Sequence, residues 1–270
     1  MTHHPIKAVI FDWAGTMIDF GCIAPVEALL QAFAAEGVEI TADEARRHMG
    51  RAKKDHLAQI LKLPRVAEAW RSAKGASPVG ADVERLFTAL EPLMETCAAR
   101  CSDLIPGAAA LVADLRADGV KIGSGTGYTR TMMSAILPAA ARQGYSPEVV
   151  ICAGDTPSGR PSPLMVWAAL IRLDAWPAAA CVKIDDAEVG IAEGRAAGCW
   201  TIGVAASGNG VGLPQGEFQA LAGPARAARV EAAAEALRDA GADYVVETVA
   251  DARPTLADIA RRIALGERPA

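Results

Sequence analysis

The stretch Lys7-Ala-Val-Ile-Phe-Asp-Trp-Ala-Gly-Thr16 begins with a short apolar run, reaches an acid at Asp12 and continues into a glycine-containing loop. A continuous apolar run of this length is typical of a strand that is buried on both faces of a parallel sheet. Ligands of open α/β sheets bind beyond the carboxyl ends of the strands. The stretch therefore predicts a first central strand and places the carboxylate of Asp12 where such ligands bind.

Five similar runs follow along the chain, separated by alanine- and leucine-rich stretches with helical patterning. Strands and helices that alternate at this spacing form βαβ units, so we expect an α/β fold with a Rossmann-like parallel sheet. The expected helices cover residues 107–118, 163–173 and 187–197 and most of 220–242. The further strands are expected at 120–124, 148–152, 180–185, 200–204 and 243–247.

Residues 20–103 interrupt this alternation. They contain no convincing strand, and Thr41-Ala-Asp-Glu44 has the form of a capping box that starts a helix. Residues 64–83 are expected to be irregular, because glycine and proline punctuate them. We interpret this block as an all-helical cap domain over 20–103, inserted into an α/β core domain that comprises 1–19 and 104–270.

The composition excludes several classes of protein. The chain has 270 residues, of which 51% are hydrophobic and 22% charged, as in a globular protein. Its net charge of −5 argues against binding to nucleic acid by bulk charge, and no basic cluster suggests a membrane surface. We recognise no signal peptide or membrane-spanning run, and the six cysteines are expected to be reduced core thiols. A cytoplasmic location is therefore expected.

Polar residues suited to phosphoryl transfer follow the expected strands. Asp12 can attack phosphorus, and Arg160 can stabilise charge that spreads in the transition state. A Mg²⁺ ion between Asp12 and an acid of the pair Asp185-Asp186 would offset the carboxylates. Backbone N–H groups and the Thr126 hydroxyl are expected to hold phosphoryl oxygens at a helix N-terminus. Each residue alone is as readily a helix cap, a turn residue or a surface side chain, so the interpretation depends on their joint occurrence.

A second group of candidate residues lies in the expected cap. Met49, Lys53 and His56 are spaced four and three apart, so they would share one face of a helix. From the pattern alone, Lys53 is more often a lysine whose stem covers apolar surface, and His56 a packed histidine. A buried lysine near other cations, however, has a lowered pKa and can form a Schiff base with an aldehyde. The helix is expected because Ala45, Met49, Ala52, His56 and Ile60 recur at helical spacing, with Lys53 in the same stripe.

The strand-end motifs resemble those of the haloacid dehalogenase superfamily, in the same order and with a helical cap after the first motif. In the phosphatases of that superfamily the first motif is Asp-x-Asp, and its second Asp protonates the departing alkoxide. Here the motif is Asp12-Trp-Ala14, so this general acid is missing. A Schiff base at Lys53 would make the acid unnecessary, because cleavage of a carbon–phosphorus bond beside the imine leaves an enamine and no alkoxide.

The resemblance is strongest to the members of the superfamily that cleave carbon–phosphorus bonds. It covers essentially the whole chain. The segments that carry it are Phe11-Asp-Trp-Ala-Gly-Thr16, Met49-Gly-Arg-Ala-Lys53 with Asp55-His56, Gly125-Thr-Gly-Tyr-Thr129, Gly159-Arg-Pro161, Lys183-Ile-Asp-Asp186 and Ser207-Gly-Asn209.

This resemblance implies hydrolysis of phosphonoacetaldehyde to acetaldehyde and phosphate, with Asp12 as the nucleophile and Lys53 as the Schiff-base lysine. It implies a Mg²⁺ ion held by Asp12, the Ala14 carbonyl and Asp186. It also implies a homodimer joined through the caps and a role in the breakdown of 2-aminoethylphosphonate. The residues expected to surround the substrate are Cys22, Met49, His56, Thr126, Gly127, Tyr128 and Arg160.

Two positions depart from the superfamily pattern. Position 190 is Gly where many members carry an acid, and Asp185 or Glu188 could replace it through a water. Position 17 is Met where a hydroxyl residue is expected.

Two other functions stay open. One is a phosphatase or phosphomutase that acts on a small phosphate ester, against which Ala14 argues. The other is a phosphometabolite-binding protein on the same fold, against which the intact nucleophile argues.

Overall fold

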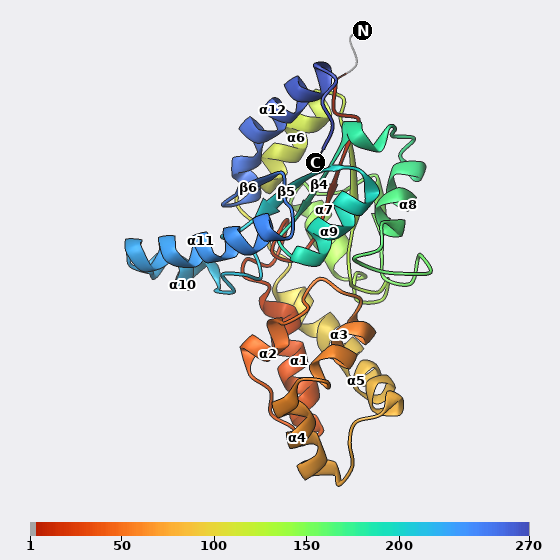
Figure 1. Ribbon diagram of the computed structural model, residues 1–270, viewed down its shortest axis with the longest axis vertical. Helices are drawn as coiled ribbons and strands as arrows, with labels where there is room; N and C mark the ends of the chain where they lie inside the picture. Colours follow the sequence, from red (N-terminus) through yellow and green to blue (C-terminus); the bar gives the residue numbers. More distant parts are fainter. Residues whose placement is uncertain (1–3, 270) are drawn as a thin grey trace.

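The computed structural model describes residues 4–269 and contains a six-stranded sheet in which every pair of neighbouring strands is parallel (Figure 1). The strand order β3-β2-β1-β4-β5-β6 is that of doubly wound folds. It places β1 between β2 and β4, at the point where the chain changes direction across the sheet. The Rossmann-like parallel sheet is thereby confirmed. The strands are β1 (Ala8–Phe11), β2 (Lys121–Gly125), β3 (Val149–Ile151), β4 (Cys181–Asp185), β5 (Trp200–Val204) and β6 (Tyr244–Val246).

Helices cover both faces of this sheet. Side chains of β1 alternate between the two faces: Val9 and Phe11 belong to the larger apolar core, and Ala8 and Ile10 pack with residues of α8. On the first face lie α6 (Ala108–Ala117), α7 (Ile136–Arg142) and α12 (Ala252–Ala264). On the other lie α8 (Leu164–Arg172), α9 (Glu188–Ala197) and α11 (Gly223–Asp239). The remaining short helices outside the insertion are α10 (Gln215–Ala220), η1 (Ala178–Ala180) and η2 (Val249–Asp251).

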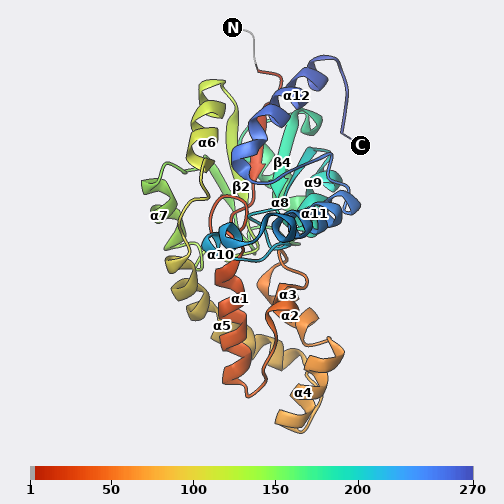
Figure 2. The same ribbon diagram turned by 90° about the vertical axis from the view of Figure 1, so that its left-hand side faces the viewer.

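Most of the segment between β1 and β2, up to the end of α5, forms a helical cap at one end of the sheet. Figures 1 and 2 both show its helices gathered below the strands, with α4 farthest from the core. The cap has apolar packing of its own, in which the rings of Phe33 and Trp70 meet edge to face at 6.4 Å. Its helices are α1 (Ile23–Ala35), α2 (Ala42–Arg46), α3 (Lys53–Ile60), α4 (Pro64–Lys74) and α5 (Gly80–Arg100).

Two sequence-based expectations about the cap are wrong. The single helix expected through Ala45 and Ile60 is divided into α2 and α3, since His48 and Gly50 have φ angles of 63° and 88°. Gly50 can adopt this left-handed backbone without strain, and a Cβ there would lie 2.8 Å from the side chain of Val189 in the core. The loop therefore fits closely against the core where a continuous helix would not.

The stretch 64–83, expected to be irregular, is largely helical. Pro64 occupies the first turn of α4, where its missing N–H costs no hydrogen bond, and Gly75 ends the helix with a φ angle of 76°. The glycine and proline residues thus mark the ends of helices and do not interrupt one. By contrast, the capping box at Thr41 and Glu44 is confirmed, since each side chain accepts a hydrogen bond from the other residue's backbone N–H.

Two expectations about the whole chain can also be compared with the structure. All six cysteines are free, and four of them lie buried beside apolar residues of the core: Cys97, Cys152, Cys181 and Cys199. Within residues 4–269, the helices are too short or too polar to span a lipid bilayer.

Candidate active site

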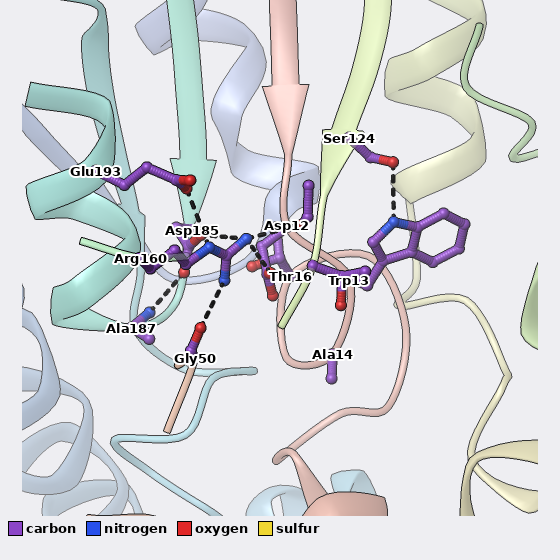
Figure 3. Close-up of polar contacts among 12 residues, drawn as sticks. Asp12, Trp13, Ala14, Thr16, Gly50, Ser124, Arg160, Asp185, Ala187 and Glu193 are labelled. Atoms are coloured by element: carbon purple, nitrogen blue, oxygen red, sulfur yellow. Dashed lines mark hydrogen bonds and ion pairs between the residues drawn. The ribbon is translucent and has the colours of Figure 1, made fainter. Parts of the chain in front are cut away.

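Asp12 lies at the carboxyl end of the central strand and is paired with Arg160. The backbone N–H of Asp12 donates to the carbonyl of Ile184 at 2.9 Å, which extends the sheet by one residue and fixes the position of the carboxylate. Arg160 comes from the loop before α8, and its Nη2 lies 2.7 Å from Asp12 Oδ1 and 2.8 Å from the carbonyl oxygen of Gly125 (Figure 3). The guanidinium is 3% exposed, so this cation acts at short range in a poorly solvated place.

A buried network behind Arg160 holds its guanidinium in one orientation. Arg160 Nε donates to Glu193 Oε2 at 3.0 Å, and Lys183 Nζ lies 2.8 Å from Asp185 Oδ2 and 3.7 Å from Glu193 Oε2. All four side chains are buried. Buried charges are stable only when paired, and the planar guanidinium forms its bonds in fixed directions. Glu193 therefore orients the edge of Arg160 that faces Asp12, and Figure 3 shows both partners around the guanidinium.

Three buried carboxylates form a group that could hold a metal ion. One oxygen from each of Asp12, Asp185 and Asp186 lies within 4.8 Å of the other two. Burial and the Asp185 charge raise the pKa of Asp12 to about 6, although Arg160 and Lys183 oppose the shift. Burial, together with Asp12 and Asp185, raises the pKa of Asp186 well above its usual range. A bound cation would relieve this repulsion, and carboxylate and carbonyl oxygens suit a hard divalent ion.

The third carboxylate, Asp186, is held by donors from three segments. Asn209 N–H donates to its Oδ2 at 2.8 Å, the thiol of Cys22 donates to the same oxygen at 3.3 Å, and Thr16 Oγ1 donates to Oδ1 at 3.3 Å. The Cys22 thiol also lies 3.1 Å from the carbonyl oxygen of Ala14, which lines the same cavity. These contacts bring the three residues expected to bind metal, Asp12, Ala14 and Asp186, to one place.

The glycine at position 190, where many members of the superfamily carry an acid, is explained by Asp185. A Cβ on Gly190 would lie 2.0 Å from Cγ of Asp185, so the Asp185 carboxylate occupies the space that a side chain would need. That carboxylate accepts the backbone N–H of Ala187 at 3.1 Å and pairs with Lys183. Arg160 and Lys183 outweigh the effect of burial and lower the pKa of Asp185, so it stays ionised beside Asp12.

Lys53 lies at the start of α3 and reaches the site from the cap. The side chain is 2% exposed, with Nζ 3.8 Å from the sulfur of Met49 and 5.1 Å from the centre of the Tyr128 ring. Burial lowers the pKa of Lys53 to about 8, with a further lowering by Arg160, while Cys22 and Asp12 oppose the shift. A larger share of neutral amine is therefore present near neutral pH than for an exposed lysine.

One cavity between the cap and the core joins these groups. With the exception of His56, every residue expected to bind substrate or metal lines it, and the cavity wall also includes Pro25, Gly50, Arg51 and Ala187. His56 is fully buried, and burial together with the Lys53 charge lowers its pKa to about 3, so the imidazole is neutral. The expected residues that the structure brings together there are Asp12, Ala14, Cys22, Met49, Lys53, Thr126, Gly127, Tyr128, Arg160 and Asp186.

The loop after β2 corrects one detail of the expected phosphate site. Thr126 was expected to stand at a helix N-terminus, but the next helix, α7, begins only at Ile136. The Thr126 hydroxyl instead accepts the backbone N–H of Tyr128 at 3.1 Å, which shapes the turn. The loop stays close to the cap, since a Cβ on Gly127 would lie 2.5 Å from the carbonyl oxygen of Arg51. Thr126 and Gly127 would therefore contact a phosphoryl group from a turn and not from the first turn of a helix.

Sequence reasoning missed the residues that support the site. Lys183 stands inside the buried strand β4 and Glu193 on the buried side of α9, where ionised residues need partners. A charged residue within an apolar strand was the signal that could have revealed this pair. Asn209 stood in a segment that carries the family resemblance, but no role was assigned to it, and Arg46, which it contacts across the domains, gave no signal because charged residues at helix ends are common.

The acid at the end of the central strand, the buried cation and the group of three carboxylates lie together at the edge of a doubly wound sheet, as in one class of enzyme. Residues 6–198 match the family described as haloacid dehalogenase-like hydrolases. The chain belongs to this family, and it is a hydrolase.

Particular relatives resemble the chain over nearly its whole length. It is 48% identical over 264 residues to phosphonoacetaldehyde hydrolase of Paraburkholderia phytofirmans, covering 98% of this chain and 99% of that protein. It is 42% identical over 265 residues to phosphonoacetaldehyde hydrolase of Nitratidesulfovibrio vulgaris, covering 98% and 95%. The crystal structure of a phosphonoacetaldehyde hydrolase-like protein from Oleispira antarctica superposes with a TM-score of 0.97 at 42% identity, covering 98% and 96%.

Proposed function

We propose that this enzyme hydrolyses the carbon–phosphorus bond of phosphonoacetaldehyde to acetaldehyde and phosphate. The observation that carries the proposal is that Lys53 and Asp12 line the same cavity. Ala14 stands at the position where a phosphatase of the superfamily has its general acid. A buried amine suits an aldehyde, and a carboxylate beside a buried guanidinium suits phosphorus. The names of the curated relatives support the same substrate.

The proposed reaction divides one difficult cleavage into steps that Lys53 and Asp12 share. The Lys53 amine condenses with the aldehyde carbon and releases one water. A carboxylate oxygen of Asp12 then attacks phosphorus, while the carbon–phosphorus bond breaks and its electron pair moves into the protonated imine to give an enamine. Water hydrolyses the aspartyl phosphate to phosphate and restores Asp12. A proton adds to the enamine carbon, and a second water releases acetaldehyde from Lys53.

The surrounding side chains suit these steps. Arg160 would stabilise the charge on the transferring phosphoryl group, and the Thr126–Gly127 turn would contact its oxygens. The ring of Tyr128, 5.1 Å from Lys53 Nζ, would stabilise the protonated imine through its π face. Burial raises the pKa of the Cys22 thiol well above its usual range, so Cys22 acts as a neutral donor.

Two further residues complete the proposed surroundings of the aldehyde. Met49 supplies apolar contact, with its sulfur 3.8 Å from Lys53 Nζ. His56 does not line the cavity, so we propose that it packs near Lys53 and does not contact the substrate.

We propose Mg²⁺ as the metal ion, held by Asp12, the Ala14 carbonyl and Asp186. The buried carboxylates fit a hard divalent cation, as described above. When bound, the ion would neutralise repulsion between the phosphonate and the carboxylates and polarise a phosphoryl oxygen. Asp185, which pairs with Lys183 and lies against Gly190, would act on the ion through a water.

The proposal is tested by incubating the enzyme with phosphonoacetaldehyde and measuring acetaldehyde and phosphate. We expect equal release of the two products with Mg²⁺ and none with a chelator. Borohydride added during turnover should reduce the imine and attach a stable two-carbon adduct to Lys53, which peptide mass spectrometry locates. Hydrolysis of simple phosphate esters without acetaldehyde release would identify an ester phosphatase or phosphomutase instead. Binding of substrate without any turnover would identify a binding protein.

Four further expectations belong to this proposal. The free cysteines suit the reducing cytoplasm, where we place the enzyme, and its reaction would follow transamination of 2-aminoethylphosphonate. The limits 20–103 for the cap remain a prediction, and so does the homodimer through the caps. Among the described residues, exposed large apolar side chains are Trp167, Ile171, Trp176 and Leu265 on the core, against Val79 on the cap. Sedimentation velocity of Trp176→Ser and Val79→Ser variants would show which domain, if either, supports a dimer.

A further inference from the structure

Arg46, the last residue of α2, connects the cap helices with the segment before α1 and with the loop after β5. Its Nη1 donates to the carbonyl oxygen of Gly21 at 2.8 Å and to Asn209 Oδ1 at 3.2 Å. Its Nη2 donates to the carbonyl oxygen of Gly212 at 2.7 Å. Asn209 returns a bond from Nδ2 to the carbonyl oxygen of Arg46 at 3.3 Å. One cap side chain thus contacts both the segment before α1 and the loop after β5.

The core loop that receives Arg46 is shaped to do so. Gly212 has a φ of 66°, and a Cβ there would lie 2.6 Å from Arg46 Nε. Ser207 Oγ donates to the Gly15 carbonyl oxygen at 2.7 Å, and Gly21 N–H donates to the Ser207 carbonyl oxygen at 2.8 Å. The loop is therefore tied to the turn after the nucleophile, and it leaves room for the guanidinium.

The same loop holds a carboxylate of the site. The backbone N–H of Asn209 donates to Asp186 Oδ2 at 2.8 Å, while the Asn209 side chain contacts Arg46. On the cap side, Arg46 is followed by the loop that carries Met49 and Gly50 and leads to Lys53. Arg46 therefore connects the loop before the amine with the residue that holds Asp186.

A buried site of this kind requires the cap to move. Lys53 is 2% exposed in the cavity between the domains, so a substrate reaches it only when the cap and core separate. Hydrogen bonds that exist only in the closed arrangement stabilise it relative to the open one. Bonds to charged donors are stronger than those between neutral groups, which makes Arg46 well suited to this task.

We propose that Arg46 is a positioning residue that holds the cap closed over the core, through its bonds to Gly21, Asn209 and Gly212, and so keeps Lys53 opposite Asp12 and Asp186. The inference rests on the proposed function only for its kinetic consequence. The effect on closure itself follows from the contacts of Arg46 and requires no particular substrate.

Cys22 provides a measure of closure that is independent of turnover. Because Arg46 Nη1 also lies 3.5 Å from the carbonyl oxygen of Cys22, Asn209→Ala, which keeps that contact, separates closure from a local effect on the thiol. Its thiol is 2% exposed and lines the cavity, whereas Cys181 and Cys199 are buried beside the sheet. Alkylation by N-ethylmaleimide in Mg²⁺-containing buffer, followed by peptide mass spectrometry, reports each thiol separately. Opening of the cap exposes Cys22, while loss of the fold exposes all three.

The test compares Arg46→Gln with a matched control, Arg47→Gln. Arg47 is the next residue and exposed, and within residues 4–269 its side chain has no hydrogen bond or ion pair. We expect Cys22 of Arg46→Gln to react about tenfold faster than in wild type and the control, with Cys181 and Cys199 unchanged. Asn209→Ala should have a smaller effect, and the double variant should react no faster than Arg46→Gln. Arg46→Lys should recover part of the loss.

Steady-state kinetics with phosphonoacetaldehyde provide the second readout. Because substrate binding must then close the cap unaided, KM should rise about tenfold in Arg46→Gln while kcat stays within about threefold. A structural role alone would lower the active fraction, and therefore kcat, with KM unchanged. Equal Cys22 rates in Arg46→Gln and Arg47→Gln, a parallel rise at Cys181 and Cys199, or a loss confined to kcat would each overturn the inference. Faster Cys22 alkylation in an enzyme that releases no acetaldehyde would support closure by Arg46 and reject the proposed function.

Discussion

The guanidinium of Arg160 lies 2.7 Å from the carboxylate of Asp12, and the two side chains come from segments far apart in the sequence. The pair forms because β1 and the loop before α8 end at the same edge of a parallel sheet. Arg160 is also bound by Glu193, so its position does not depend on substrate. A carboxylate and a cation are therefore held together on the core side of the cavity, and Lys53 reaches the same cavity from the cap.

Replacement of Lys53 by arginine should abolish turnover. Guanidinium keeps the positive charge but forms no imine with an aldehyde. We expect a loss of at least about a thousandfold in kcat/KM, as when other groups that form covalent intermediates are removed. The matched control is Lys54→Arg, since Lys54 is exposed and pairs with Glu84 on the cap surface. Acetaldehyde release within tenfold of wild type in Lys53→Arg would contradict the Schiff base.

The rate of imine formation should rise with pH up to about 8 and then level off. Burial lowers the pKa of Lys53 to about 8, and the neutral amine, which increases as pH rises through that value, is the form that attacks the aldehyde. Borohydride trapping at short times, between pH 6.5 and pH 9.5, measures this step directly. Below the pKa, each pH unit should change the rate about tenfold. A trapping rate that is flat or falls over this range would show that Lys53 is not the titrating group.

The burial of Lys53 should also lower the free energy of unfolding of the enzyme at neutral pH. A folded pKa of about 8 against an ordinary value of 10.5 means that the unfolded chain binds the proton more strongly. The penalty is fully present below pH 8 and disappears as pH rises towards 10.5. Lys53→Met should therefore raise the free energy of unfolding at pH 7, by up to roughly 3 kcal/mol, and by less at pH 10. Denaturant unfolding at both pH values measures the difference, and an equal or larger gain at pH 10 would contradict the sign.

Loss of the Glu193 carboxylate should impair phosphoryl transfer through Arg160. In Glu193→Leu, Arg160 Nε loses its partner at 3.0 Å and Lys183 loses a nearby charge. We expect kcat/KM to fall roughly ten- to hundredfold, whereas Glu193→Gln, whose amide oxygen can still accept the bond, should lose much less. Inorganic phosphate affinity, measured by calorimetry, should follow the same order. Equal losses in the two variants would mean that the bond to Arg160 Nε is unimportant.

Removal of divalent metal should stop turnover reversibly and lower thermal stability. Repulsion among Asp12, Asp185 and Asp186 is relieved when a cation binds the folded state, so Mg²⁺ should raise Tm by several degrees. Mg²⁺ at a hundredfold excess over its Kd would add about 2.7 kcal/mol to the free energy of unfolding. The shift should be largely lost in Asp186→Asn and retained in Asp239→Asn, which changes an exposed acid on α11. A shift of equal size in both variants would place the ion elsewhere.

Much of the core could be predicted from short apolar runs. Each of the strands lies within a residue or so of its expected position, since short, largely apolar runs such as Ala8–Phe11 and Trp200–Val204 are typical of strands buried in a parallel sheet. The cap was harder to predict, since α2 and α3 share one apolar pattern and only the backbone at His48 and Gly50 separates them. Local pattern indicates which residues are apolar, but it does not show where the core presses a loop into a left-handed turn.

The sequence by itself determined the parallel α/β core and the acid at the end of its first strand. Residue type and spacing also placed Lys53 on the apolar face of a cap helix, and the resemblance to the superfamily motif showed that the acid is missing at position 14. Only the tertiary structure decided that Lys53 and Asp12 share a cavity, that Glu193 and Lys183 support Arg160, and that Arg46 reaches Asn209. The physical reason is that the burial and pairing of charged groups depend on packing between segments that are distant in the chain. A local sequence pattern does not show which of these segments come into contact.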